Sequence, residues 1–558
     1  MGARAPRAAK MNAAAALVAE MSSDSCGAVS PSVYETARLV TLAPWLAGHP
    51  QRVLFLLGAQ RRDGSWGAPD GYGLVPTLSA TEALLTSLRR WRHGGSEPAL
   101  DYADVLSSAD RGLQTLFGWL GADARIALPD TIAAEIVIPA LVEQVNTHLA
   151  GFGSAPVSGL EHWREGGRLR LPPGVDDGLL ARLRHLRCHG HDLPTKLWHS
   201  LEAVGPLVRG APFIHPVHGA VGCSPAATAA WLPEGTGCPT VVDYLHAVQH
   251  RGGGPVPGVT PITVFERAWV LATLTAAGIG VRVPPEIVDS LHAAFGAGGV
   301  AAGPGLPPDS DDTAVTLYAL AQVGSPRSLD CLWAYRVDAH FSCFPNERTP
   351  STSTNAHILQ TFGRYLEHNF PQRFRHRAAM GKLAGWLRDH QEADGYWWDK
   401  WHASPYYATA RCATALHRHS RTASTAAVSG AVEWLLDSQR ADGSWGRWRG
   451  TYEETAYAVQ TLLRTRVSRS DSAVEQAVAR GCVFLQRSGG DHPPDPDPPL
   501  WHDKDLYTPV RVVRAEGLAA LHQAYTNPHV AAFIDYWTPP VPDTAERDTE
   551  ETEQERAG

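Results

Sequence analysis

The sequence contains little that would suggest a metal centre, a disulfide framework or a membrane span. It has eight cysteines in 558 residues, and none forms a CxxC pair or lies near histidine at the spacing of a zinc site. These cysteines therefore predict free, buried thiols in a cytoplasmic protein. No apolar run reaches the roughly 20 residues that cross a bilayer, and we find no signal-peptide segment at the N-terminus.

An excess of positive charge is also missing. The chain carries 49 Lys and Arg against 57 Asp and Glu, a formal net charge of −8. This balance gives no electrostatic basis for binding nucleic acid. Hydrophobic residues make up 44% of the chain, which at this length predicts two or three domains with sizeable cores.

Runs of alternating polarity long enough to build a sheet are absent, and helical spacing of apolar residues takes their place. Gly, Pro, Asp and Asn separate the helical runs, so the sequence predicts an all-α protein. Two polar ends, residues 1–25 and the acidic stretch 541–558, are predicted to be disordered.

A short motif, QxxDGxW, follows three of the apolar helical runs. It occurs at Gln60–Trp66, Gln391–Trp397 and Gln439–Trp445, and the last two copies start 48 residues apart, the length of one helical hairpin. Asp-Gly provides a tight turn, and Trp provides a flat face for the next helix. We interpret the motif as a structural element of an α-barrel rather than as a catalytic one.

Three carboxylates lie within four residues at the start of a predicted helix, where Asp309, Asp311 and Asp312 follow a proline pair. Asp309 is placed to cap the helix. Two like charges about 4 Å apart repel by roughly 4 kcal/mol at an effective dielectric constant near 20. One carboxyl should therefore stay protonated and could act as a proton donor. Considered alone, the cluster is equally compatible with an exposed acidic cap or a metal site.

The QxxDGxW repeats together with the DxDD cluster resemble class II terpene cyclases, the superfamily that includes squalene-hopene cyclases. The run LPTKLWHSLE at 193–202 is similar to the PTxLLHSLEG stretch of copalyl diphosphate synthases, which are class II diterpene cyclases. Residues 222–228, 256–261 and 265–267 resemble further segments of that family in the same order. The resemblance covers most of residues 35–530.

This resemblance implies an architecture of two α-barrel domains, β and γ, without a class I α domain. Residues 26–47 would form the first helix of the β domain, 48–262 the inserted γ domain, and 263–540 the rest of the β domain. The active site would lie between the two barrels.

The resemblance also implies roles for the acidic cluster. Asp311 would be the general acid that protonates the terminal alkene of geranylgeranyl diphosphate, with Asp309 and Asp312 holding it in place. Asn355 would hydrogen-bond the acid and orient its proton. His199 corresponds to the family histidine that, with an asparagine, holds the water that removes the final proton.

Gly258 stands where the family has that asparagine, and glycine has no side-chain donor or acceptor. The identity of the group that removes the final proton is therefore left open. The product could be copalyl diphosphate, or methyl and hydride shifts could lead to a halimadienyl or clerodienyl diphosphate. A C15 substrate with a drimane-type product is a further alternative.

Cation stabilisation and diphosphate binding need different side chains. Aromatic faces stabilise a carbocation by about 0.5 to 2 kcal/mol each without capturing it. The candidate aromatic residues are Trp198, Trp269, Trp333, Trp397, Trp398, Tyr406, Tyr407 and Trp501. Candidate diphosphate ligands are Lys196, Arg182 and Arg184. Glu135 resembles a family glutamate near the proposed Mg²⁺ site, where magnesium would bridge the carboxylate to phosphate oxygens.

Three other classes of protein share some of these features. A class I or bifunctional synthase requires DDxxD and NSE-type motifs, and a protein prenyltransferase β-subunit requires an Asp/Cys/His zinc site; the sequence shows neither. A helical-repeat binding module would explain the hairpins but has no need of DxDD. We therefore expect an enzyme that retains the diphosphate. We also expect a homodimer, and a downstream class I diterpene synthase that uses the product.

Overall fold

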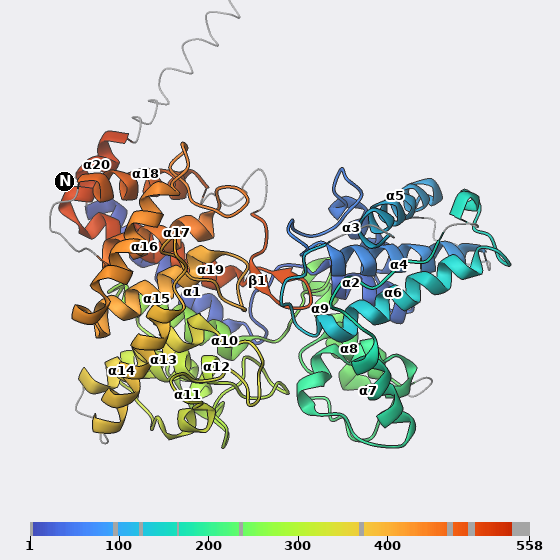
Figure 1. Cartoon of the computed structure of the whole chain (residues 1–558), viewed down its shortest axis with the longest axis horizontal. Helices are drawn as coiled ribbons and strands as arrows, with labels where there is room; N and C mark the ends of the chain where they lie inside the picture. The colour runs from blue at the N-terminus through green and yellow to red at the C-terminus, as the bar shows by residue number, and fades with distance from the viewer. Residues whose placement is uncertain are drawn as a thin grey trace, which may run out of the picture.

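The computed structural model describes residues 4–92, 99–121, 126–163, 167–233, 238–367, 373–465, 472–488 and 497–537. Two helical domains lie side by side, with a small hairpin at their junction (Figure 1). In this hairpin, strand β1 (Trp501–His502) pairs antiparallel with strand β2 (Leu506–Tyr507). The described residues form no other sheet, which confirms the predicted all-α class. None of the helices described is long and apolar enough to cross a membrane.

The β domain is a double ring of helices. Six inner helices pack each on the next, and the last closes on the first. They are α10 (Thr263–Ala276), α12 (Ser310–Gln322), α13 (Thr352–Glu367), α15 (Pro405–His419), α17 (Tyr452–Arg464) and α19 (Val510–Thr526). The outer helices are α1 (Arg4–Ser23), α11 (Pro285–Ala293), α14 (Arg373–Asp389), α16 (Thr425–Asp437), α18 (Ser472–Ser488) and α20 (Pro528–Trp537), with short 3₁₀ segments η4 (Asp330–Tyr335) and η5 (Thr422–Ser424).

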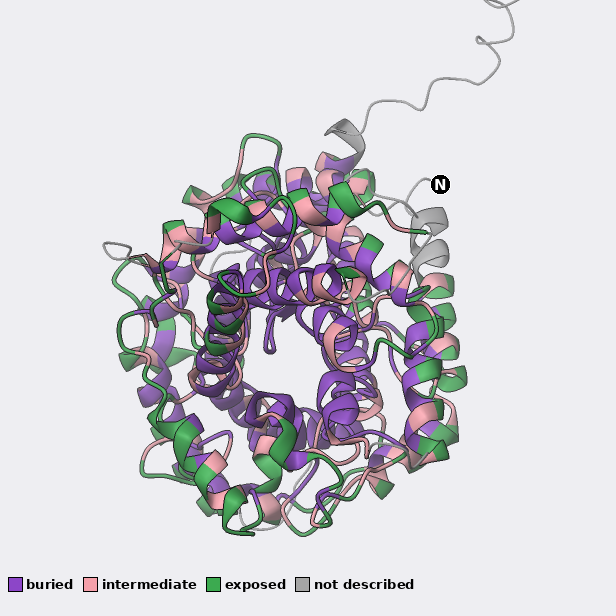
Figure 2. Ribbon diagram, turned by 90° about the vertical axis from the view of Figure 1, so that its right-hand side faces the viewer, coloured by how far each residue is buried: buried purple, intermediate pink, exposed green. Residues whose placement is uncertain are grey.

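The γ domain repeats this construction on a smaller scale. Its inner elements are α2 (Val33–Leu42), α4 (Leu74–Arg92), α6 (Ala134–Gly151), the 3₁₀ segment η2 (Thr195–Val204) and α8 (Pro225–Trp231). Its other elements are α3 (His49–Ala59), α5 (Tyr102–Leu120), α7 (Gly178–Cys188), α9 (Pro239–Gly252), η1 (Glu161–Trp163) and η3 (Pro206–Val208). Figure 2 shows buried helices surrounded by helices with exposed outer faces, as expected when each helix buries one stripe.

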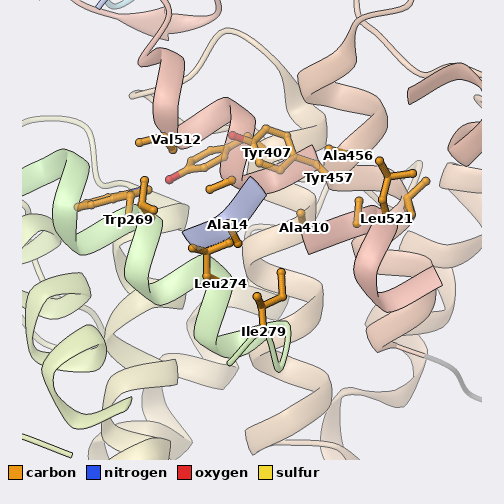
Figure 3. Close-up of a cluster of buried hydrophobic side chains, with 14 of the residues drawn as sticks. Ala14, Trp269, Leu274, Ile279, Tyr407, Ala410, Ala456, Tyr457, Val512 and Leu521 are labelled. Carbon is orange, nitrogen blue, oxygen red and sulfur yellow. The ribbon is translucent and has the colours of Figure 1, made fainter. Parts of the chain in front are cut away.

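The prediction that residues 1–25 are disordered is wrong for the described part of that segment. Helix α1 covers Arg4–Ser23 and packs against α19 and α10. Ala14, Leu17 and Met21 are fully buried in the core cluster that contains Trp269, and Figure 3 shows Ala14 and Trp269 in that cluster. The alanine-rich composition of this helix concealed its apolar stripe, because small side chains contribute little to average hydrophobicity.

The predicted start of the γ domain is also wrong. Helix α2, expected as the first helix of the β domain, instead packs on α3, α4 and α8, and Tyr34, Ala37 and Val40 lie in the γ core. Helix α1 is the N-terminal helix of the β domain, and the γ domain begins near Val33 rather than at 48. Its predicted end is closer, since α10 of the β domain begins at Thr263. The predicted disordered tail, 541–558, lies outside the described residues.

The QxxDGxW motifs are structural, as predicted. In each copy the Trp indole N–H donates to a helix carbonyl ten residues earlier, at 2.7 Å. The Gln amide crosses from its own turn to the next helix; Gln439, for example, donates to the carbonyls of Gly443 and Ala477. The motif glycine has a positive φ, +98° at Gly395 and +88° at Gly443, where a side chain would be strained.

Candidate active site

A cavity of about 400 Å³ lies at the junction of the two domains. Its lining combines side chains from both barrels with the β1–β2 hairpin. Six aromatic residues line it: Phe265, Trp269, Phe344, Trp401, Trp501 and Tyr507. The DxDD carboxylates line the same cavity, so the predicted acid and an aromatic wall share one space.

Asp309 caps helix α12, as predicted, and its side chain accepts a hydrogen bond from the Asp312 amide at 2.7 Å. Asp309 and Asp312 are each only 6% exposed. Burial, reinforced by the charge of Asp311, raises the pKa of Asp309 to about 7. Burial and the neighbouring Asp309 raise the pKa of Asp312 well above its ordinary value. The cluster therefore retains protons near neutral pH, because desolvation and like charges both disfavour ionisation.

Asp311 differs from Asp309 and Asp312 because its carboxyl contacts a histidine. Its Oδ1 lies 2.7 Å from Nδ1 of His357 on α13, and its side chain is 13% exposed against 7% for that of His357. The imidazole lies edge-on to Trp269, with ring centroids 5.7 Å apart. Donation from Nδ1–H would stabilise the carboxylate that remains after a proton leaves Asp311.

The predicted hydrogen bond from Asn355 to the acid is absent. Asn355 is fully buried, and its Oδ1 accepts from the Phe341 amide at 2.8 Å. Its Nδ2 donates to the carbonyls of Phe341 and Ser351, at 3.0 and 2.8 Å. Both amide protons and the acceptor are thus used by backbone groups, and His357, two residues further along α13, holds Asp311 instead.

His199 lines the cavity, and its partner is a residue that sequence reasoning did not identify. Its Nδ1 lies 2.7 Å from the carbonyl of Gly222, and its Nε2 lies 2.7 Å from Oδ1 of Asp503 at the tip of the β1–β2 hairpin. Gly258 lies beside this pair: a Cβ built on it would be 2.6 Å from Oδ2 of Asp503. Asp503 therefore occupies the space that a side chain at position 258 would need.

Charged residues line the more exposed part of the cavity, and we call this region the mouth. It contains Lys196, Asp130, Glu135 and Arg348. Lys400 also lines the cavity, but its side chain is largely buried and pairs with Glu347 at 2.5 Å. Arg348 pairs with Glu135 at 3.3 Å, and Lys196 is exposed.

Two predicted diphosphate ligands are not brought to this mouth. Arg182 and Arg184 lie on α7 and do not line the cavity. Arg184 instead pairs with Glu143 of α6 at 2.7 Å. The basic run of α7 therefore belongs to the surface and helix contacts of the γ domain.

Three predicted aromatic contacts are core residues rather than cavity residues. Trp198 packs in the γ core and donates to the Leu193 carbonyl at 3.3 Å. Trp397 is the fully buried tryptophan of a QxxDGxW motif. The Tyr406 ring packs against Trp434, with centroids 4.6 Å apart. Three further candidates, Trp333, Trp398 and Tyr407, do not line the cavity either. Trp269 and Trp501, also predicted, do line it.

Two residues that contact predicted site residues, His357 beside Asp311 and Asp503 beside His199, had weak sequence signals. His357 follows Asn355 by two positions in a run of small polar residues, and only its place on α13 distinguishes it. Asp503 belongs to the charged triplet Asp503–Asp505 between apolar residues, a pattern typical of a hairpin tip exposed to water. In the structure the triplet is buried.

Two stacked α-barrels with an acidic cluster facing an aromatic cavity at their junction define a class II terpene cyclase. Comparison with known proteins agrees: the squalene-hopene cyclase C-terminal domain family matches residues 348–488. The chain is 48% identical over 521 residues to the ent-copalyl diphosphate synthase of Streptomyces sp. (strain KO-3988), covering 92% of this chain and 96% of that protein.

Two further comparisons show to which family of class II terpene cyclases the chain belongs. The labda-7,13-dienyl diphosphate synthase of Streptomyces clavuligerus is 40% identical, over 93% of this chain and 94% of that protein. The solved structure of ent-copalyl diphosphate synthase from Streptomyces platensis aligns with a TM-score of 0.86 at 49% identity, covering 92% of this chain and 99% of that one. The chain belongs to the family of copalyl diphosphate synthases.

Proposed function

We propose that this chain cyclises geranylgeranyl diphosphate to copalyl diphosphate by proton-initiated chemistry and leaves the diphosphate in place. One observation carries the proposal: Asp311, held by His357, lies in an aromatic-lined cavity beside two carboxyls that retain their protons. The relative that is 48% identical over almost its full length is named an ent-copalyl diphosphate synthase, which supports the same chemistry.

Asp311 would act as the general acid. Its proton adds to the terminal alkene, the two ring bonds form from successive alkenes, and a tertiary cation remains. His357 donates to the carboxylate left on Asp311, while the neighbouring Asp309 and Asp312 remain neutral and add no repulsive charge. The apolar rings of Trp269, Trp501 and other lining aromatics exclude water and stabilise the moving cation.

The mouth supplies the charge for the diphosphate. Lys196 and Arg348 lie there with the carboxylates of Glu135 and Asp130. No group of three or more His, Cys, Asp or Glu among the described residues could hold a metal ion, so the protein alone builds no complete metal cage. This donor set fits magnesium, which commonly uses one or two carboxylates and takes its remaining ligands from phosphate and water. When bound, magnesium would neutralise phosphate charge.

The position of the last proton removal distinguishes the candidate products. Copalyl diphosphate requires loss of a proton from the methyl group beside the final cation, whereas a labda-7,13-dienyl product requires loss from a ring carbon. We favour copalyl diphosphate of the ent series because the relatives with 48% and 49% identity carry that name. Halimadienyl, clerodienyl and C15 drimane-type products are outcomes that the experiment below would detect.

The deciding experiment is incubation of the purified chain with geranylgeranyl diphosphate and Mg²⁺, followed by dephosphorylation and chiral chromatography. We expect copalol of the ent series and no release of inorganic pyrophosphate. Pyrophosphate formed at the rate of substrate loss would show class I ionisation and contradict the proposal. Parallel incubation with farnesyl diphosphate tests the C15 alternative.

The product would remain an allylic diphosphate, which a class I diterpene synthase could ionise downstream. All eight cysteines are free, which supports a reducing compartment such as the cytoplasm. The prediction that they are buried holds for Cys223, Cys343, Cys412 and Cys482, whereas Cys188 is exposed and the other three are partly exposed. The expected homodimer stays a prediction, to be measured by light scattering.

A further inference from the structure

The cavity wall contains an acidic residue, Asp503, that lies far from the DxDD cluster in sequence. It is at the tip of the β1–β2 hairpin and is only 2% exposed. Its Oδ1 contacts Nε2 of His199, 304 positions away and in the other domain, at 2.7 Å. Both residues line the cavity that holds Asp311.

The hydrogen bonds of His199 determine where its protons are. The carbonyl of Gly222 can only accept, so Nδ1 of His199 must carry a proton to make the 2.7 Å contact. The opposite nitrogen, Nε2, faces the Asp503 carboxyl at the same distance, which requires one more proton between them. Burial opposes both charges, but the two groups stabilise each other, so the pKa of His199 is raised and that of Asp503 is lowered. This assigns the shared proton to His199, and the pair is an imidazolium with a carboxylate. Both nitrogens of His199 are then donors, and the imidazole has no lone pair to accept a proton.

One atom of the pair remains free to accept. Oδ2 of Asp503 is buried and has no hydrogen-bond partner among the described residues. It lies against Gly258, the position that lacks a side chain. A buried carboxylate oxygen without a partner is unfavourable by about 1 to 3 kcal/mol or more, so its retention in a cavity wall calls for a role.

We propose that Oδ2 of Asp503 is the terminal base of the reaction proposed above, and that His199 positions Asp503 rather than accepting the proton itself. In this step the C–H bond next to the final cation breaks, its electron pair forms the new C=C bond, and the proton passes to Oδ2. Asp503 later releases that proton to water. Because Asp311 regains one proton from water in each cycle, the net reaction is an isomerisation.

A weakly basic carboxylate is sufficient for this step. Burial opposes ionisation of Asp503, but the charges of His199 and Lys504 keep its pKa below the ordinary value. Protons next to a tertiary carbocation are far more acidic than a carboxylic acid, so the position of the base controls which proton leaves. Gly258 contributes by leaving room for Asp503, since any Cβ there would meet Oδ2.

The neighbouring residues explain why Asp503 is not needed simply to dock the hairpin. Lys504 donates to Glu202 at 2.9 Å and to the His199 carbonyl at 2.7 Å. Asp505 accepts from the Ser32 hydroxyl at 2.6 Å and the Tyr34 amide at 3.0 Å. These contacts hold the hairpin against the γ domain and do not involve Oδ2 of Asp503.

Two variants and one control test the proposal by product analysis. Asp503→Asn removes the basic oxygen, and Gly258→Ala displaces it while keeping the charge, at a backbone position that requires no positive φ. Both should still consume geranylgeranyl diphosphate, but the wild-type alkene should fall at least about tenfold as a fraction of product, within the range of general-base effects. Hydroxylated or rearranged diphosphates should replace it. Asp505→Asn, the matched hairpin control, should lower the melting temperature and keep the wild-type product.

An exchange variant supplies the rescue. Asp503→Ala combined with Gly258→Asn places an amide on the other side of the same gap beside His199, where it could hold a water as base. We expect this double variant to regain wild-type alkene relative to Asp503→Ala alone. An unchanged product ratio in both Asp503→Asn and Gly258→Ala would overturn the proposal. Failure of the wild-type chain to consume geranylgeranyl diphosphate would instead refute the proposed function.

Discussion

Two Asp–His pairs meet at one cavity, whose wall contains Asp311, Asp503 and His199, while His357 contacts Asp311 from behind the wall. Their surroundings favour a protonated acid cluster at one pair and an ionised carboxylate at the other. Asp311 and His357 lie within the β barrel, whereas Asp503 and His199 meet across the domain junction; in both pairs the contact is 2.7 Å. Asp311 has carboxyl groups on either side. Asp503 has Lys504 beside it.

The neighbours explain the difference. Crowded carboxyls with raised pKa values keep protons at the DxDD end, whereas the cations around Asp503 lower its pKa and keep it ionised. The same pair of residue types can thus serve as an acid at one end of a reaction path and as a base at the other. The predictions below test each end in order of expected effect.

Asp311→Asn should abolish turnover and leave the fold intact. The amide is nearly isosteric with the carboxyl but cannot deliver its proton. Substrate consumption measures the effect, and circular dichroism with thermal melting checks the fold. Activity above about a tenth of wild type would remove Asp311 from the role of acid, since a general acid contributes about 10² to 10⁴ in rate.

His357→Ala should lower kcat by about 10² to 10⁴ with little change in KM, if His357 acts by holding the acid. Asn355→Ala is the informative comparison. Its side chain bonds only backbone groups, so we expect it to lower stability by about 1 to 3 kcal/mol. If Asn355→Ala and His357→Ala lowered kcat equally, both measured at a temperature where each variant is folded, Asn355 would also act on the acid.

His199→Ala should leave protonation by Asp311 working and change the product. Loss of the imidazolium removes the partner of Asp503, so the carboxylate moves or takes up a proton. We expect substrate consumption to continue within about tenfold of wild type, while a hydroxylated bicycle or another alkene isomer replaces part of the product. Complete retention of the wild-type product would make His199 a packed polar residue only.

Lys196→Ala and Arg348→Ala should raise KM by about tenfold while changing kcat by less than about threefold, because they remove charge from the mouth and not from the acid. Arg184→Ala is the matched control, since Arg184 pairs with Glu143 away from the cavity. EDTA should act in the same direction as the mouth variants. A KM effect in Arg184→Ala as large as in Arg348→Ala would return α7 to the diphosphate site.

The smallest expected effect is on pH dependence. Asp309 is neutral below its pKa of about 7. As pH rises through this value it ionises beside Asp311 and makes proton donation less favourable, so kcat should decrease. Between pH 3.8 and about pH 7, Asp309 is protonated in the folded protein but ionised in the unfolded chain. The contribution of Asp309 to the free energy of unfolding therefore also decreases as the pH rises through this range.

This decrease is measured from the pre-steady-state rates of the wild-type chain and Asp309→Asn between about pH 6 and 9. Asparagine still caps the helix but cannot ionise, so the decrease should move to higher pH. A wild-type profile without any decrease above pH 7 would contradict the pKa assigned to Asp309.

Predictions based on local patterns were the ones that the structure confirmed. The helical class, the capping role of Asp309 and the QxxDGxW turns each depend on residues a few positions apart. Predictions that required packing across the chain failed more often. Helix α2 was assigned to the wrong domain, and Arg182, Arg184, Trp198, Trp397 and Tyr406 were placed at a cavity that they do not line.

The sequence by itself determined which segments are helical, where the carboxyl cluster begins a helix, and which tryptophans hold turns. Apolar spacing, capping and turn chemistry act over a few residues, and the residue types encode them directly. Only the tertiary structure decided that His357 rather than Asn355 holds Asp311, and that Asp503 joins His199. These pairs are 46 and 304 positions apart, so they depend on how the barrels pack and on the space that Gly258 leaves open.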